Sequence, residues 1–239
     1  MAYKPITDQQ VRLYMSDLQT HSQRTAAARA GFSERTARRT IAALGYNECV
    51  TYSFIDGSDA ALFGGGTDAV RIENPISSEM THLRPDLLPG LLAAAARNQA
   101  RGFMDLALFE IGPAFHGGEP GEQHLQATGL LVGASAARDP HGSRRPVDVF
   151  DVKADVEAVL AALGAPAKVQ ISRKVAAWFH PGRSGVIGLG PNVMATFGEV
   201  HPRVLAEMGV KGPAMAFTVL VANVPQPKVK TPTRPALSI

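Results

Sequence analysis

Two carboxylates and two histidines are the residues whose types and spacing could do chemistry in this sequence. Glu110 lies in an alternating apolar stretch, and Glu199 lies two residues before His201, which puts both on one face of a continuing strand. A carboxylate and an imidazole on one face form a possible metal pair. His180 and His201 each precede a proline, however, and this dipeptide biases a residue toward extended backbone. Anchoring of turns is therefore the interpretation we favour for both histidines.

A second group of residues with chemical potential is basic and lies in the first part of the chain. Residues 1–45 hold seven lysines and arginines against three acidic residues, whereas the rest holds 17 basic and 18 acidic residues. Three signals predict a helix-turn-helix. Apolar residues have helical spacing over 8–20, a glycine at 31 is placed to end a second helix, and a serine at 33 is placed to cap a third. A solvated basic face on a helical hairpin is the alternative. The candidate contacts to nucleic-acid phosphate are Arg24, Arg35, Arg38 and Arg39.

The elements that must position these residues are strands and helices in alternation. Strand composition is found at 48–54, 106–115, 125–134 and 214–224, and helical periodicity at 87–101 and 150–163. Three glycines at 64–66 indicate a plain loop, because the Lys-Ser/Thr of a phosphate-binding loop does not follow them. Four prolines within 225–239 are typical of a linker.

The bulk composition excludes several classes of protein. The chain has 239 residues, of which 45% are hydrophobic and 19% charged, which is ordinary for a globular protein. It has no run of about 18 apolar residues and no apolar signal region, so we expect neither a membrane span nor secretion. Its single cysteine, Cys49, can form no internal disulfide, which fits a reducing cytoplasm.

An ordered set of motifs resembles one family. The motifs are ALGYNECVTYSF, ENPISSEMTHLRPDLLPGLLAAAARNQARG, LALFEIGPAF, FDVKADVEAVL, FHPGRSG and FGEVHPRVL, spread over residues 40–225. Together they resemble the synthetase-like module of the β subunit of bacterial phenylalanine–tRNA ligase. The resemblance implies an α+β fold, an antiparallel sheet flanked by helices like the core of class II aminoacyl-tRNA synthetases. It also implies an α subunit as partner, tRNA bound by the whole enzyme, and an inactive copy of the core.

The residues agree with an inactive copy. A class II site must stabilise charge on the α-phosphate of ATP with fixed cations and magnesium. Residues 108–115 and 192–198 contain no arginine or lysine, so a phosphate placed there would face apolar side chains. We therefore expect no catalytic residue, cofactor or metal in this chain. ATP and magnesium are implied for the whole enzyme only.

The resembling family builds its subunit interface at the helix that leads into ALGYNE. We therefore expect residues 36–46 to meet a partner chain, with Ile41, Leu44 and Tyr46 at the interface. Arg84 and Arg183 could bind RNA phosphate or pair with an acid, inside the chain or at the interface, and we favour pairing. Without its partner the chain should self-associate, most simply as a two-fold dimer.

The start of the chain departs from this family. Residues 1–39 are similar to the helix-turn-helix N-terminus of insertion-sequence transposases. The sequence thus predicts a basic helix-turn-helix segment over 1–39, a synthetase-like module over 40–224 and a proline-rich tail over 225–239. Two functions stay open: a ligase subunit that pairs with an α chain, and a DNA-binding protein that uses residues 1–44.

Overall fold

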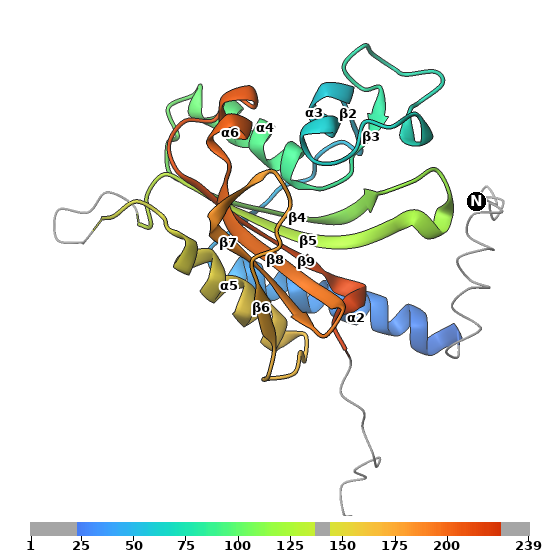
Figure 1. The fold of residues 1–239 in the computed structure, drawn as a ribbon, viewed down its shortest axis with the longest axis vertical. Coiled ribbons are helices and arrows are strands. Elements are labelled where there is room, and N and C mark those ends of the chain that lie inside the picture. Colours follow the sequence, from blue (N-terminus) through green and yellow to red (C-terminus); the bar gives the residue numbers. More distant parts are fainter. Residues whose placement is uncertain (1–22, 137–143, 226–239) are drawn as a thin grey trace, which may run out of the picture.

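The structure, a computed structural model, describes residues 23–136 and 144–225 (Figure 1). The helix predicted over 8–20 and nearly all of the proline-rich tail lie outside the described residues. The strands are β1 (Asn47–Glu48), β2 (Phe54–Ile55), β3 (His82–Leu83), β4 (Leu106–Phe115), β5 (Gln123–Val132), β6 (Gln170–Ser172), β7 (Phe179–Leu189), β8 (Asn192–Val200) and β9 (Ala214–Leu220). The α-helices are α2 (Gln23–Ala43), α3 (Gly57–Leu62), α4 (Leu88–Gln99), α5 (Val149–Ala162) and α6 (Pro202–Glu207).

Seven strands form one sheet in the order β1-β4-β5-β9-β8-β7-β6. All neighbouring pairs are antiparallel except β1 and β4, which run parallel. A separate two-stranded sheet joins β2 to β3. The predicted α+β class with an antiparallel sheet flanked by helices is confirmed, with the β1–β4 pair as the one parallel exception among the described strands.

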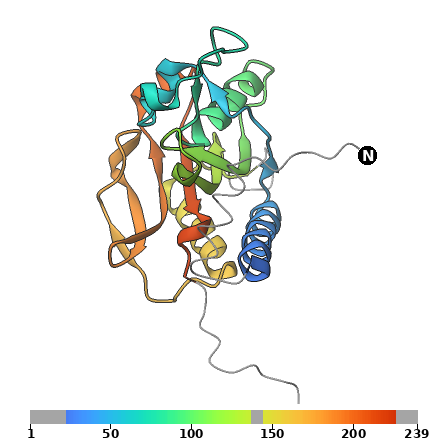
Figure 2. The ribbon, with the colours of Figure 1, turned by 90° about the vertical axis from the view of Figure 1, so that its right-hand side faces the viewer.

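Helices cover both faces of the sheet. On one face, α2 and α5 lie side by side in both views (Figures 1 and 2), and they pack on alternate strand residues such as Phe109 and Phe217. On the other face, α4 and α6 pack on Leu108 and Leu130. Because successive strand residues point to opposite faces, β4 can supply both cores at once.

Helix α2 corrects the helix-turn-helix prediction. It runs without a break from Gln23 to Ala43, through Gly31 and past residue 40. Glycine costs a helix only about 1 kcal/mol relative to alanine, and the flanking sequence is rich in alanine and arginine. Ala37 and Ile41, both fully buried, fix the C-terminal half of α2 on the core that α5 covers. Tertiary packing therefore holds α2 beyond the predicted turn, and the backbone at Gly31 itself is helical.

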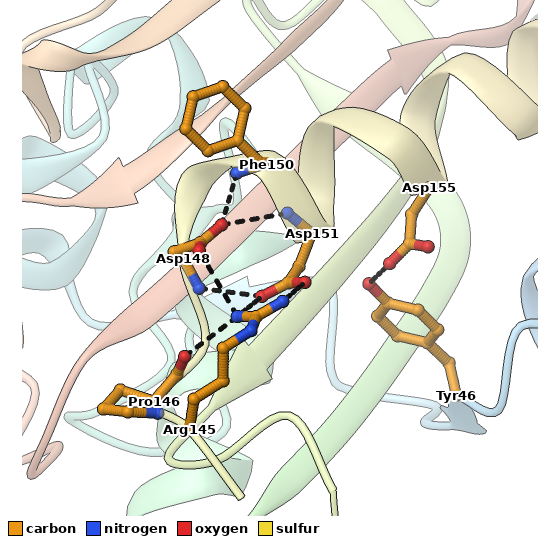
Figure 3. A network of polar contacts seen from close by, with 7 residues as sticks. All are labelled: Tyr46, Arg145, Pro146, Asp148, Phe150, Asp151 and Asp155. Atoms are coloured by element: carbon orange, nitrogen blue, oxygen red, sulfur yellow. Dashed lines mark hydrogen bonds and ion pairs between the residues drawn. The ribbon is translucent and has the colours of Figure 1, made fainter. Parts of the chain in front are cut away.

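Helix α5 begins with a network of polar contacts (Figure 3). The side chain of Asp148 accepts hydrogen bonds from the backbone N–H groups of Phe150 and Asp151, and the Asp151 carboxylate accepts one from the Asp148 N–H. Arg145 donates to both carboxylate oxygens of Asp151, and this lowers the pKa of Asp151. Such a capping box satisfies donors that a helix start leaves open. The helix predicted over 150–163 is confirmed within one residue at each end.

The helix predicted over 87–101 is also confirmed, as α4. The Asp86 carboxylate accepts the Leu88 N–H at 2.8 Å and so satisfies one open donor at the start of this helix. Within the described ranges, no helix is both long and apolar enough to span a membrane.

Candidate subunit interface and the buried polar cluster behind it

A buried ion pair lies at the centre of β4. Glu110 is 3% exposed, and Arg84, which directly follows β3, is 2% exposed. The Arg84 Nη1 donates to Glu110 Oε1 at 2.7 Å and to Thr51 Oγ1 at 2.9 Å, and its Nε donates to the Pro113 carbonyl at 3.0 Å. Glu110 thus meets a cation from a segment that precedes it by 26 positions. The sequence motif alone showed no cation near this carboxylate.

Thr51 completes this cluster. Its hydroxyl donates to Glu110 Oε2 at 2.6 Å, and its backbone N–H donates to Glu110 Oε1 at 3.3 Å. The carboxylate therefore accepts hydrogen bonds on both oxygens, from a hydroxyl, a backbone amide and a guanidinium. A buried charge is tolerated only when it is paired and hydrogen-bonded in this way. We refer to Thr51, Arg84 and Glu110 as the buried cluster.

The strand face around Glu110 is polar, which corrects the expectation that a phosphate would face apolar side chains. Glu110, Thr128, Thr218 and Thr196 are register partners across β4, β5, β9 and β8, and the hydroxyls of Thr128 and Thr218 lie 3.0 Å apart. None of the four is a cation, and the charge of Arg84 is compensated by Glu110. The residues present therefore do not fit a triphosphate with its magnesium, and we derive no step through ATP in this chain.

The histidine and carboxylate candidates do not form a metal site. The exposed Arg183 side chain pairs with Glu199, with Nη2 at 2.8 Å from Oε1. His201 Nδ1 accepts the Arg203 N–H at the start of α6, and His180 Nδ1 accepts the Gly182 N–H. Among the residues that the structure describes, no group of three or more potential ligands could hold a metal ion. The prediction of a turn anchor holds for His201, which caps α6, whereas His180 lies inside β7 next to a register shift.

Three of the five predicted interface residues prove to be internal. Ile41 is fully buried in the core, Tyr46 is 5% exposed, and Arg84 belongs to the buried cluster. The Tyr46 hydroxyl donates to Asp155 of α5 at 2.5 Å (Figure 3), and burial followed by this bond raises the pKa of Tyr46. The interface prediction was wrong for Ile41 and Tyr46 because α5 and the sheet cover positions that the helical pattern left open, whereas Arg84 pairs with an acid inside the chain, one of the two pairings we favoured. Leu44 and Arg183 are exposed and stay predictions.

The segment from residue 49 to residue 54 was missed as a surface feature. Val50 is 92% exposed and Tyr52 72% exposed, whereas Thr51 between them points to the buried cluster. A half-buried extended segment normally turns its apolar residues inward and its polar residues outward. Here the order is reversed, with Phe54 also on the exposed side. We call residues 49–54 the outward segment. Its alternation was visible in the sequence, but its direction was not.

The four arginines predicted to contact nucleic acid lie on α2. Arg38 is committed within the chain, because it donates to Glu48 at 2.7 Å and to Glu34 at 2.9 Å. Arg35 and Arg39 are exposed, and the side chain of Arg24 lies outside the described residues. A recognition helix needs a turn before it, and α2 has none at Gly31. The DNA-binding hypothesis thus has no structural support.

Comparison with known proteins decides the family. A profile described as "Phenylalanyl tRNA synthetase beta chain CLM domain" matches residues 17–220. The chain belongs to this family. The match begins well before residue 40, so it includes more than half of the segment that the sequence suggested to be foreign.

Curated relatives agree with this assignment. The β subunit of phenylalanine–tRNA ligase from Cereibacter sphaeroides is 81% identical over 206 residues, which cover 86% of this chain and 26% of the relative. The corresponding subunit from Ruegeria pomeroyi is 67% identical over 204 residues, covering 85% and 26%. The chain thus spans about a quarter of the length of these relatives.

A solved structure supports the fold. The pyrrolysyl tRNA synthetase PylSc of Desulfitobacterium hafniense superimposes with a TM-score of 0.60 at 14% identity, over 88% of this chain and 73% of that one. At this identity the likeness concerns the fold alone.

Proposed function

We propose that this chain is a non-catalytic module of a phenylalanine–tRNA ligase β subunit, and that it pairs with the α subunit through the outward segment. The α subunit would bind ATP and magnesium, and the assembled enzyme would bind tRNA in the cytoplasm. This chain would supply a folded surface. The family match supports the first part of the proposal.

The observation that carries the second part is the reversed alternation of residues 49–54. Val50 and Tyr52 protrude while a threonine occupies the inward position. Exposing large apolar side chains in this order is costly in water, and it is typical of a surface that another chain covers. Leu44, 39% exposed at the end of α2, extends the same stretch of chain. The aromatic Tyr52 is the kind of residue that dominates the binding energy of interfaces.

The proposal is tested by measuring the affinity of the 239-residue chain for the α subunit of the same organism. Tyr52→Asp should weaken binding at least about a hundredfold, since a central aromatic anchor contributes on the order of 3 kcal/mol. Phe150→Asp is the matched control, because Phe150 is also 72% exposed but stands at the start of α5 (Figure 3). Absence of binding by the wild type, or equal losses in both variants, would refute the proposed interface.

A further inference from the structure

Thr51 is the point at which the outward segment is fastened to the body of the protein. Backbone hydrogen bonds hold the segment on either side, from the Cys49 N–H to the Phe109 carbonyl at 2.7 Å and from the Arg84 N–H to the Ser53 carbonyl at 2.9 Å. Between them, Thr51 is held by its hydroxyl and its N–H on the Glu110 carboxylate. Fixing Thr51 inward places its two neighbours outward, because side chains of an extended segment alternate.

A glycine in α4 makes this arrangement possible. A Cβ added at Gly90 would lie 2.3 Å from Thr51 Oγ1 and 2.9 Å from Thr51 Cβ. The Thr51 side chain therefore lies between the backbone of α4 at Gly90 and the Glu110 carboxylate. Arg84, on the opposite side of the cluster, packs equally closely on a glycine: a Cβ added at Gly112 would lie 2.7 Å from Arg84 Nη2. Both glycines leave room for the buried cluster.

We infer that the buried cluster is a positioning site for the subunit interface: Arg84 and Glu110 hold Thr51, and Thr51 sets the direction in which Val50 and Tyr52 face the α subunit. The Glu110 carboxylate has the role of an internal anion, bound by a guanidinium, a hydroxyl and an amide. The inference rests on the proposed function.

The first test displaces Thr51 without removing any charge. Gly90→Ala puts a methyl group where the Thr51 hydroxyl lies, while alanine itself favours the helix. Amide hydrogen exchange of residues 49–54 in the chain alone should then become faster, and affinity for the α subunit should fall about tenfold or more. Gly121→Ala is the control, since a Cβ there meets nothing within 4 Å.

The second test changes the chemistry at Thr51 at nearly constant shape. Thr51→Val removes the hydroxyl that donates to Glu110, and Thr51→Ser retains it. Thr51→Val should weaken binding to the α subunit as Gly90→Ala does, and Thr51→Ser should restore most of the affinity. Circular dichroism of each variant establishes that it is folded. If Gly90→Ala does not fold, the valine and serine pair still decides the matter.

The outcomes separate this inference from the proposed function. Faster exchange over 49–54 together with weaker binding supports the positioning site. Unchanged exchange in Gly90→Ala and Thr51→Val overturns it. Faster exchange with undiminished binding also overturns it, while the loss of binding in Tyr52→Asp would leave the proposed interface intact. If the wild-type chain binds no α subunit, the proposed function fails first, and the inference fails with it.

Discussion

At the scale of single residues, Asp86 is a carboxylate whose ionisation conflicts with its buried surroundings. It is 6% exposed, and burial raises its pKa to about 6 although two backbone N–H groups and Arg84 favour the charged form. The unfolded chain releases this proton near pH 4 and the folded chain only near pH 6. Between these values the folded state binds more protons, so the stability contribution of Asp86 is lost as the pH rises.

Asp86→Asn should remove this dependence. Wild-type protein should lose about 2 kcal/mol of unfolding free energy from this group between pH 4 and pH 6, and the variant should lose none of it. Urea unfolding of both proteins at several pH values measures the difference. Asparagine keeps an oxygen for the Leu88 N–H, so the helix start is preserved. Parallel pH profiles would contradict the assignment of this slope to Asp86.

Tyr46 supports a second prediction at this scale. Tyr46→Phe deletes the hydroxyl that donates to the Asp155 carboxylate, and it leaves a half-buried charge without that donor. We expect a loss of about 1.5–3 kcal/mol in unfolding free energy at pH 7. Denaturant unfolding gives the value. A change of a few tenths of a kcal/mol would show that water replaces the tyrosine hydroxyl at no cost.

At the scale of elements, the continuity of α2 has a direct test. Gly31→Ala should stabilise the protein by about 0.5–1 kcal/mol, because alanine is the better residue inside a helix. If Gly31 formed the turn of a helix-turn-helix, the same change would destabilise the protein. Gly45→Ala is the control: Gly45 has φ +95° just beyond α2, so an added side chain there should be destabilising. Thermal unfolding of the two variants gives the signs.

The elements show what a sequence can and cannot predict here. Helices α4 and α5 were found almost to the residue, because their apolar spacing and first turns are local signals. The turn predicted at Gly31 was wrong, because a single glycine costs a helix only about 1 kcal/mol and does not by itself end one. The direction of the outward segment could not be predicted, since it depends on Arg84 and Glu110, which lie 33 and 59 positions beyond Thr51. The local residue pattern predicts an extended segment at 49–54, whereas contacts with Arg84 and Glu110 decide which of its side chains face the solvent.

At the scale of the whole molecule, the chain alone should not activate phenylalanine. The register row around Glu110 offers no free cation for the α-phosphate, because the charge of Arg84 is compensated by Glu110. We expect phenylalanine-dependent exchange between ATP and pyrophosphate to stay at background. The complex with the α subunit is the positive control. Exchange by the purified chain without that partner would contradict the assignment of an inactive core.

The order of strands also governs how the molecule must acquire its shape. β9 is the middle strand of seven, yet it is the last of the described strands in sequence order, and its Thr218 meets Thr128 from 90 positions earlier. During synthesis, the edges of β5 and β8 that pair with β9 therefore remain without a partner strand until residue 220 has left the ribosome. Such non-local closure is slow and exposes strands to wrong pairing. We expect nascent chains that stop before residue 214 to recruit chaperones, and release of β9 to end that dependence abruptly.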